Sequence, residues 1–342
     1  MIKKLVCFAI TIIMLVQFIA CKSNIMSGLG ESSSNTTNKN DMEYSNMKKI
    51  ILDTDIGVDC DDAVAIALLL GLQKRNLCQL LGVSTSTARS GATSAVRAIL
   101  DYYGETDIPC GRMYTPFLPC DHTNNYAQKL MDKYNKPEAE EESVHLIRRL
   151  LANATEKVIL VAVGPLTTIA KLLQSEADEL SSLSGMDLVK EKVDTFYTMA
   201  GRFIHNFGEW NVVQDIPSAR FVFDNMPVNT VVSPGELGDV VYTGSSVAGC
   251  ENHPVLDSLI GFFEEQENYT PTDVYKRQSW DPLTCYAAVL GMDDFNISEK
   301  GDAKIDEFGV STFTPNENGK FIILNSAKDN GEIAKKIDQL IV

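Results

Sequence analysis

The sequence lacks the features of several common protein classes. Its 342 residues include only 22 glycines, 12 prolines and 8 cysteines, and 44% of them are apolar against 22% charged. This composition excludes a collagen-like chain, a fully disordered chain and a short disulfide-stabilised scaffold. Basic residues are also in deficit, since 30 Lys and Arg face 46 Asp and Glu, for a formal net charge of −16. Because such a charge repels phosphate backbones, nucleic acid is not expected as a partner.

The apolar run near the start is too short to span a membrane. It covers residues 5–20, follows Lys3 and Lys4, and falls short of the roughly 20 residues that a spanning helix needs. This pattern predicts an export signal over residues 1–20. The segment Phe18-Ile19-Ala20-Cys21 is similar to a bacterial lipobox, although Phe replaces the usual Leu. We expect an exported protein held at a membrane only by a lipid on Cys21, with a soluble secreted form as the alternative.

The rest of the chain divides into a tether and one domain. Residues 21–46 are polar and aperiodic, which predicts a flexible tether. Residues 47–342 show no internal repeat and no second linker, so we expect a single domain there. Its six cysteines are spaced too irregularly for a disulfide framework or a zinc site. We expect most of them to be small buried apolar residues, and only Cys110 and Cys120 suggest a disulfide worth testing.

From residue 47 onward, short β-branched runs alternate with longer helical segments. This alternation predicts an α/β fold, with an open, mostly parallel sheet flanked by helices and a Rossmann-like core. The expected strands are residues 49–55, 77–87, 157–164, 193–200 and 228–233. The expected helices are residues 61–72, 92–103, 165–173, 255–265, 282–290 and 331–341.

The end of the first expected strand carries the strongest functional signal. Asp53, Asp55, Asp59, Asp61 and Asp62 place five carboxylates within ten residues, between an apolar strand and an apolar helix. In an open parallel sheet, ligands bind beyond the carboxyl ends of the strands. Mutual repulsion makes such crowding costly unless a cation neutralises it, and oxygen ligands favour a hard divalent ion such as calcium. The alternative, that Asp61 and Asp62 only cap a helix, leaves the carboxylates on the strand unexplained.

A second acidic position lies much later in the chain. Calcium takes six to eight oxygen ligands, so distant segments must contribute to a site of this kind. Asp281 precedes Pro282 at the start of an expected helix, where it is either such a ligand or a plain N-cap.

Four segments, taken together, resemble the inosine/uridine-type nucleoside hydrolases. They occur in the family's order and cover nearly all of residues 47–342. The resemblance implies the family's fold, hydrolysis of the N-glycosidic bond of a small-molecule nucleoside, calcium as cofactor and a homo-oligomer. The four segments are the acidic strand-end motif, Gly164-Pro165-Leu166-Thr167-Thr168-Ile169-Ala170, Glu209-Trp210-Asn211 and Trp280-Asp281-Pro282.

The resemblance also implies a role for each matching position. Asp55 corresponds to a calcium ligand that serves as general base for the attacking water. Asp62 and Asp281 correspond to further calcium ligands, and Val163 to a position whose main-chain carbonyl completes the shell. The residues that correspond to sugar-hydroxyl ligands are Asp61, Glu209 and Asn211, with Asn206 as a further candidate and Asp53 as a supporting carboxylate. Such a site would hydrolyse the bond by direct water attack, with inversion, through an oxocarbenium-like sugar.

The chain departs from the family pattern at three places. Asp59-Cys60 are two extra residues before the paired aspartates, so either Asp59 or Asp61 can be the sugar ligand. Arg89 stands where many members bind the sugar with an asparagine, and it either contacts the substrate or pairs with an acidic residue. Trp280 replaces the histidine of pyrimidine-accepting members and resembles the tryptophan of purine-preferring ones, which stacks on the base. We therefore expect a purine nucleoside as substrate.

Two other classes of protein are compatible with parts of the pattern. Asp53-Thr54-Asp55 also fits the start of a haloacid-dehalogenase phosphatase, which uses magnesium, although Gly57 stands where that family has Thr or Val. A lipid-anchored protein that binds a nucleoside or sugar without turnover is the non-enzymatic alternative. Release of phosphate, release of free base, or tight binding without release would distinguish the three.

Overall fold

A computed structural model describes residues 47–114, 125–266 and 275–342. The predictions for the export signal, the tether and the lipid anchor lie outside these residues, as do Cys120 and therefore its pairing with Cys110. Cys60, Cys78 and Cys285 are buried free thiols, and Cys110 is a partly buried one. Within the described ranges no helix combines the length and apolar character needed to cross a bilayer.

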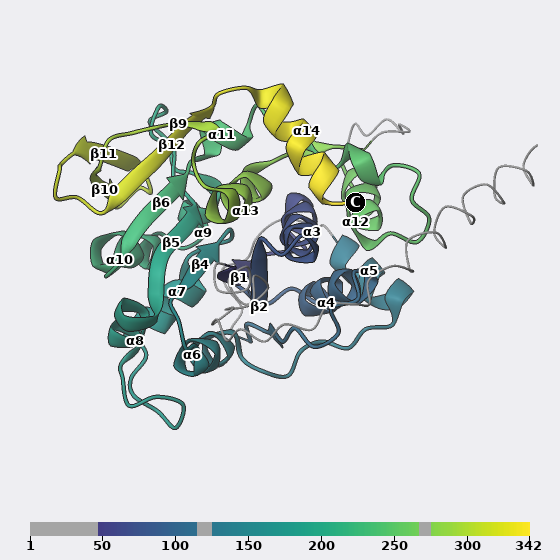
Figure 1. The fold of residues 1–342 in the computed structure, drawn as a ribbon, viewed down its shortest axis with the longest axis horizontal. Coiled ribbons are helices and arrows are strands. Elements are labelled where there is room, and N and C mark those ends of the chain that lie inside the picture. Colours follow the sequence, from purple (N-terminus) through teal and green to yellow (C-terminus); the bar gives the residue numbers. More distant parts are fainter. Residues whose placement is uncertain (1–46, 115–124, 267–274) are drawn as a thin grey trace, which may run out of the picture. The chain divides into compact units, whose positions relative to one another are not determined.

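The centre of the domain is a ten-stranded sheet with strand order β11-β10-β12-β6-β5-β4-β1-β2-β3, in which β9 also pairs with β12 (Figure 1). All pairings from β12 to β3 are parallel, whereas β9, β10 and β11 add antiparallel strands at one edge. β7 and β8 form a separate antiparallel pair. The strands are β1 (Lys48–Thr54), β2 (Cys78–Thr85), β3 (Cys110–Gly111), β4 (Val158–Ala162), β5 (Val193–Met199), β6 (Asn229–Ser233), β7 (Tyr242–Thr243), β8 (Arg277–Gln278), β9 (Phe295–Ile297), β10 (Gly301–Ile305), β11 (Ser311–Pro315) and β12 (Phe321–Ala327).

The chain order reverses between two neighbouring strands. From β1 the chain moves outward to β2 and β3, then returns to place β4 on the other side of β1. Leu52 of β1 therefore lies between Val83 of β2 and Val161 of β4. A reversal of this kind leaves a crevice at the carboxyl ends of the two strands, where open α/β sheets bind their ligands.

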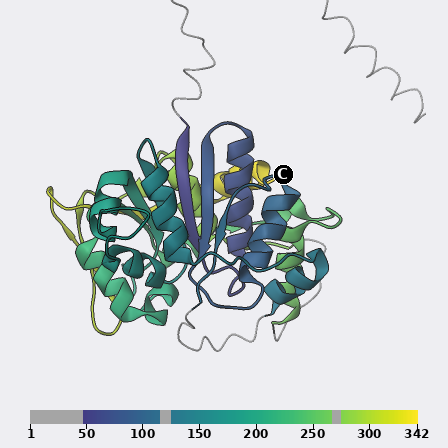
Figure 2. The same cartoon turned by 90° about the horizontal axis from the view of Figure 1, so that it is seen from below.

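Helices cover both faces of the sheet (Figure 2). One core contains residues of α3, α4, α5, α12, α13 and α14, and the other contains residues of α6, α7, α8 and α10. The helices are α3 (Asp61–Lys74), α4 (Ala92–Tyr102), α5 (Tyr126–Tyr134), α6 (Ser143–Asn153), α7 (Thr167–Gln174), α8 (Gly185–Lys192), α9 (Trp210–Gln214), α10 (Ile216–Asn225), α11 (Gly235–Gly238), α12 (Pro254–Glu264), α13 (Trp280–Leu290) and α14 (Asn330–Leu340), with a 3-10 turn at Ser245–Val247.

The two cores follow from the alternation of side chains along a strand. Ile50 and Leu52 of β1 belong to the core beneath α3, whereas Ile51 belongs to the core beneath α7. All three side chains are fully buried. A central parallel strand is covered on both faces, which explains why β1 is a continuous apolar run rather than an alternating one.

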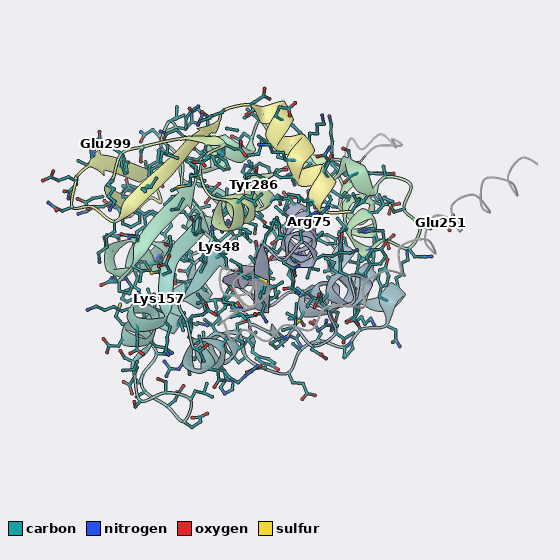
Figure 3. The ribbon with its side chains drawn as sticks, viewed as in Figure 1. Lys48, Arg75, Lys157, Glu251, Tyr286 and Glu299 are labelled. Carbon is teal, nitrogen blue, oxygen red and sulfur yellow. The ribbon has the colours of Figure 1, made fainter. Side chains whose placement is uncertain are left out.

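Helix α3 is held on several sides. Its residues from Asp61 to Leu72 are all buried. After it, the Arg75 guanidinium donates to the carbonyls of Gln339 and Leu340 at the end of α14, at 3.0 and 3.2 Å. At the start of β1, Lys48 Nζ donates to the carbonyl of Ala288 in α13 at 3.1 Å; Figure 3 labels both basic side chains. The first β–α unit is thus anchored at the centre of the fold, which fixes the loop that joins its two elements.

The predicted fold class is confirmed, and so are the expected elements. Each expected strand and helix is present, with boundaries shifted by at most two residues. The helix expected to open at Pro165 begins at Thr167 instead. The sequence did not predict the helices α5, α6, α8, α9, α10 and α11, the short strands β3, β7 and β8, or the strands β9 to β12 after residue 295. The edge strands are short or exposed on one side, so their apolar pattern is weak.

The stability of the fold should depend on pH through His253. This buried ring accepts a hydrogen bond from Val255 N at 3.3 Å, as the N-cap of α12, and packs 4.3 Å from the Tyr102 ring. Burial lowers the His253 pKa from 6.5 to about 4. The unfolded chain therefore binds a proton that the folded chain does not, and the neutral ring stabilises the fold above pH 6.5 and loses that contribution as pH falls toward 4.

Replacing His253 with Asn, which caps a helix without titrating, should remove this dependence. Between about pH 7.5 and pH 5 the wild type should lose roughly 2 kcal/mol of unfolding free energy relative to H253N, measured by urea denaturation. Buried carboxylates titrate equally in both proteins and cancel in the difference. A difference that does not change with pH would show that His253 stays neutral in the unfolded chain as well or is charged in the fold.

Candidate active site and metal centre

A cavity of about 480 Å³ opens beyond the carboxyl ends of β1, β4 and β5. Its size lies within the range of small-molecule sites, roughly 300–1,000 Å³. It lies at the point where the strand order reverses, between β1 and β4. The charged and aromatic residues that line it are Asp55, Asp59, Asp61, Asp62, Arg202, Glu209, Trp210, Phe262, Glu265, Arg277, Trp280 and Asp281.

The loop from β1 to α3 is shaped by one glycine and one tyrosine. Gly57 has φ +106°, a conformation that favours glycine, and a Cβ there would come within 3.1 Å of Ala127. Gly57 N donates to the buried Tyr126 hydroxyl at 2.7 Å, and this hydroxyl donates to the carbonyl of Asp59. The two residues that lengthen the motif therefore form a loop tied to α5.

The paired aspartates at the start of α3 bind different partners. The Thr54 hydroxyl donates to Asp62 Oδ1, so the last residue of β1 orients this carboxylate. Asp61 Oδ2 accepts the backbone N–H groups of Trp280 and Asp281, each at 3.1 Å. Asp61 therefore caps α13, more than two hundred positions away, and joins the first turns of the two helices.

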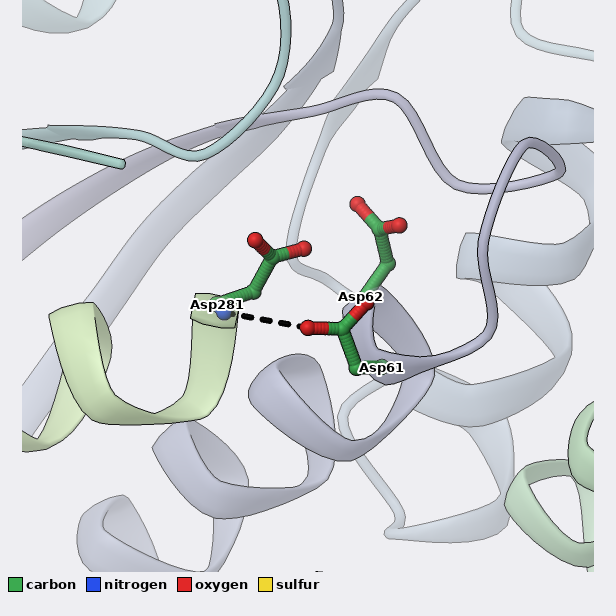
Figure 4. Close-up of side chains that lie close together, drawn as sticks. All are labelled: Asp61, Asp62 and Asp281. Atoms are coloured by element: carbon green, nitrogen blue, oxygen red, sulfur yellow. Dashed lines mark hydrogen bonds between the residues drawn. The ribbon is translucent and has the colours of Figure 1, made fainter. Parts of the chain in front are cut away.

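Asp61, Asp62 and Asp281 lie together, whereas the sequence predicted a convergence of Asp55, Asp62 and Asp281. One oxygen of each lies within 4.8 Å of one oxygen of each of the others (Figure 4). Asp55 lines the same cavity, and its charge raises the pKa values of Asp62 and Asp281. The tightest cluster thus includes Asp61, which the resemblance assigned to the sugar, together with two of the three expected side-chain ligands.

Burial makes this cluster electrostatically costly. Asp61, Asp62 and Asp281 are buried, and loss of solvation is the largest cause that raises the pKa of each well above its usual value, followed by the neighbouring carboxylates. The N-termini of α3 and α13 both point at the cluster and offset part of this repulsion. Beyond that, a bound cation would supply the missing positive charge, and the all-oxygen donor set fits a hard divalent ion.

Asp53 lies just before the cluster, on β1 itself. Ser84 of β2 donates to its Oδ1 at 2.6 Å, and burial raises its pKa to about 8. Asp53 is not among the described residues that line the cavity. Its role as a supporting carboxylate stays a prediction.

Glu209 and Asn211 reach the cavity from the start of α9. The buried Glu209 carboxylate accepts backbone N–H groups from Gly201, Asn211 and Val212 at 2.9–3.2 Å, while burial raises its pKa to about 7. Asn211 Nδ2 donates to the Val163 carbonyl at 2.8 Å. This bond ties α9 to the end of β4 and orients the carbonyl that was expected to face the metal.

Two expected sugar ligands do not line the cavity as described. Asn206 is exposed in the loop before α9. Arg89 is half-buried beside the β1–α3 loop, where a Cβ on Gly57 would lie 3.7 Å from its Cδ atom. The resemblance placed both by sequence order alone, which does not show where a side chain in a loop points. The two assignments therefore receive no support from the geometry.

Trp280 is fixed at the cavity wall. Its Nε1–H donates to the Gly235 carbonyl at 3.0 Å and to Asp239 Oδ1 at 3.1 Å. Gly238 is close enough that a Cβ there would lie 2.2 Å from the indole Cδ1. The indole is therefore held by α11. Trp210 also lines the cavity and is 40% exposed, so it is a rim residue rather than a core one.

Two arginines at the cavity belong to none of the motifs recognised in the sequence. Arg277 forms an ion pair with Asp59 at 2.6 Å, and Arg202 forms one with Asp239 at 2.7 Å. Nothing in the sequence links Arg277 to a residue 218 positions earlier. The available signal was its position three residues before Trp280, next to a recognised motif.

None of the three described histidines lines the cavity. His145 of α6 pairs with Glu141, His205 is exposed and stacks on Phe207, and His253 is buried at the start of α12. His122 lies outside the described residues. The described wall therefore offers carboxylates, arginines and aromatic rings.

Comparison with known proteins identifies the family of the chain. Residues 50–339 match the family described as inosine-uridine preferring nucleoside hydrolase. A non-specific ribonucleoside hydrolase of Salmonella paratyphi B is 30% identical over 183 residues, which cover 51% of this chain and 56% of that protein, so the chain spans about half the length of the curated relatives it matches.

Solved structures show the same fold. An inosine-uridine preferring nucleoside hydrolase from Bacillus anthracis superposes with a TM-score of 0.65 at 19% identity, over 86% of this chain and 99% of that one. A purine-preferring ribonucleoside hydrolase from Gardnerella vaginalis gives a TM-score of 0.67 at 16% identity, over 86% and 98% of the two chains. With a family match that spans residues 50–339 and a carboxylate cluster at the reversal of the sheet, the chain belongs to the inosine-uridine preferring nucleoside hydrolase family.

Proposed function

We propose that this protein hydrolyses the N-glycosidic bond of a ribonucleoside, with calcium as its cofactor. The observation that carries the proposal is the convergence of Asp61, Asp62 and Asp281 at a cavity that Asp55 also lines. The family match and the ribonucleoside hydrolase named among the relatives support the same reaction class.

The residues present fit a calcium ion. Asp55, Asp62 and Asp281 would supply carboxylate oxygens, and Val163 lines the same cavity and would supply its main-chain carbonyl. Asp61 is close enough to add a further oxygen. When bound, calcium would hold the sugar diol and lower the pKa of a water molecule.

The residues of the chain would then divide the remaining work. Asp55 accepts a proton from the water that attacks the anomeric carbon. Glu209, Asn211 and Asp61 line the cavity and would hold the sugar hydroxyls. The buried carboxylates stabilise the positive charge that develops on the sugar as the bond to the base breaks. Direct attack by water inverts the anomeric carbon.

A purine is the base that the wall favours. Trp280 contributes a large, rigid aromatic surface, and Phe262 and Trp210 add to it. Flat apolar rings suit a flat heterocycle, and a larger base buries more of their surface. A panel of purine and pyrimidine nucleosides, assayed for base release with calcium and with chelator, tests both the substrate class and the cofactor.

The two alternative classes remain outcomes of this assay. The family match favours a nucleoside hydrolase over a haloacid-dehalogenase phosphatase, which would release phosphate in magnesium. Tight nucleoside binding with no release of base would instead identify a binding protein.

Replacing Asp55 with Ala should lower turnover of the preferred nucleoside by about 10³-fold or more, because the attacking water then lacks its base. Release of free base and circular dichroism of the fold check this outcome. D194A is the matched control, since Asp194 is an exposed aspartate at the opposite end of the sheet, at the start of β5. Wild-type turnover in D55A would contradict the assigned role.

Calcium should stabilise the protein, and Asp62→Ala should weaken that effect. Ligand that binds only the folded state adds about 2.7 kcal/mol at a concentration one hundred times its Kd. We expect a rise in Tm with calcium for the wild type, a smaller rise for D62A at the same concentration, and reversal by chelator. Calorimetric titration gives the two affinities directly; equal affinities would remove Asp62 from the metal site.

We further propose that the protein is exported and held at a bacterial membrane by a lipid on Cys21, where it would act in nucleoside salvage. The lipobox-like segment after a short apolar run supports this proposal. The homo-oligomer stays a prediction, which sedimentation of the purified protein would test.

The anchor can be tested in a bacterial host. Cys21→Ala should move the protein from the membrane fraction to the soluble fraction and abolish incorporation of labelled fatty acid. C250A is a suitable control because Cys250 is a partly buried thiol of the folded domain. A C21A protein that still sediments with membranes would contradict a lipid anchor on Cys21.

A further inference from the structure

Arg277 lies between two aromatic rings at the cavity wall. Its Cζ atom is 5.0 Å from the centroid of the Phe262 ring and 5.0 Å from that of Trp280. Phe262 belongs to α12, Arg277 to β8 and Trp280 to the first turn of α13, and all three line the cavity. The flat guanidinium is therefore part of the aromatic wall to which a nucleoside base would bind.

Hydrogen bonds fix the guanidinium in place. Nε and Nη2 donate to the Asp59 carboxylate at 2.8 and 2.6 Å, and Nη1 donates to Gln278 Oε1 at 2.6 Å. Of the five N–H groups of an arginine, this leaves one on each Nη without a partner among the described residues. The pairing with Asp59 further raises the pKa of Arg277, so the group is charged at every working pH.

The indole N–H of Trp280 and the guanidinium of Arg202 are less suited than Arg277 to bind a base. The Trp280 indole N–H donates to Gly235 and Asp239, so it is not open to a ligand. Arg202 pairs with Asp239 beside α11 and lies near Glu209, the expected sugar ligand. Arg277 instead lies beside Asp59 and Asp61, in the aromatic part of the wall.

We infer that Arg277 binds the departing base and stabilises the negative charge that forms on it. This inference rests on the proposed hydrolysis. As the bond from the anomeric carbon to the base nitrogen breaks, its electron pair moves onto the base, water adds to the carbon, and the proton of that water goes to Asp55. Arg277 keeps its own protons and donates hydrogen bonds to acceptor atoms of the base, which then takes its proton from solvent.

The chemical class that suits this arrangement is a flat nitrogen heterocycle with acceptors beside the glycosidic nitrogen. Purines and pyrimidines both meet this description. A fixed guanidinium stabilises the anion electrostatically, so the site needs no histidine to protonate the base. Arg277 would thereby fill the function that the replacement of histidine by Trp280 leaves open.

Substrates with different leaving groups test the role of Arg277. For Arg277→Met, kcat/KM for the preferred nucleoside should fall about 10²-fold, the usual effect of one lost donor to a developing anion. For 4-nitrophenyl riboside, whose phenolate departs without help, the loss should be under about 3-fold. R149M is the matched control, because Arg149 of α6 forms a similar bidentate pair with Glu141, and this variant should leave the rates on both substrates unchanged. Equal losses on both substrates for R277M would overturn the inference.

A double variant separates this role from neutralisation of Asp59. Asp59→Asn combined with Arg277→Met removes the ion pair without leaving an unpaired carboxylate. The double variant should stay as slow on the nucleoside as R277M while keeping its activity on the aryl riboside. Recovery of nucleoside hydrolysis would show that Arg277 only balances Asp59, which overturns the inference.

Two further measurements keep the outcomes distinct. Arg277→Lys keeps the charge but not the planar fork, and it should recover part of the nucleoside rate; a Tm close to that of the wild type shows that it folds. Arg277 would be a purely structural residue if R277K hydrolysed the nucleoside no faster than R277M and lost as much activity on the aryl riboside. That result would overturn the inference. A wild type inactive on every riboside would refute the proposed function itself, and the inference with it.

Discussion

Repulsion among buried carboxylates is the constraint on which the rest of this molecule depends. Asp61, Asp62 and Asp281 share a volume a few ångströms across, with Asp55 nearby, and no lysine lines the described cavity. The fold reduces the cost by aiming two helix N-termini at the cluster and by binding Asp62 to Thr54 and Asp61 to backbone N–H groups. These contacts orient the acidic groups but do not neutralise them, which is why a divalent cation is the natural occupant.

The same contacts connect the centre of the site to its wall. Because Asp61 caps α13, it positions both Asp281 and Trp280, which begin that helix. Asp59, two residues earlier, holds Arg277 against the Trp280 ring. Three aspartates of one short segment thus have three tasks: Asp62 belongs to the acidic cluster, Asp61 joins two helices, and Asp59 fixes a cation at the wall. The two extra residues of the β1–α3 loop make this division possible.

The central strands of the fold and half of its helices could be predicted because the core obeys local rules. β1 is a continuous apolar run that ends in acidic residues, and α3 follows soon after it. Both elements and the loop between them can therefore be recognised in the sequence. The edge strands β9 to β11 are short and partly exposed, and their identity depends on pairing with β12 rather than on their own composition. The helices α5 and α6 carry many polar residues, so their apolar residues do not form continuous runs that identify a helix in the sequence.

The sequence by itself determined that carboxylates gather at the end of the first strand and that Asp281, Glu209 and Asn211 belong to the same family pattern. Charge density and the order of motifs are properties of the sequence itself, so they can be recognised without the three-dimensional structure. Only the tertiary structure decided that Asp61 caps α13, that Asn206 is exposed and Arg89 lies beside the Gly57 loop, away from the described cavity wall, and that Arg277 pairs with Asp59 between two rings. Those contacts depend on the path of a loop and on segments far apart in the chain. The spacing of residues in the sequence does not show which of the many acidic and basic side chains will form a pair.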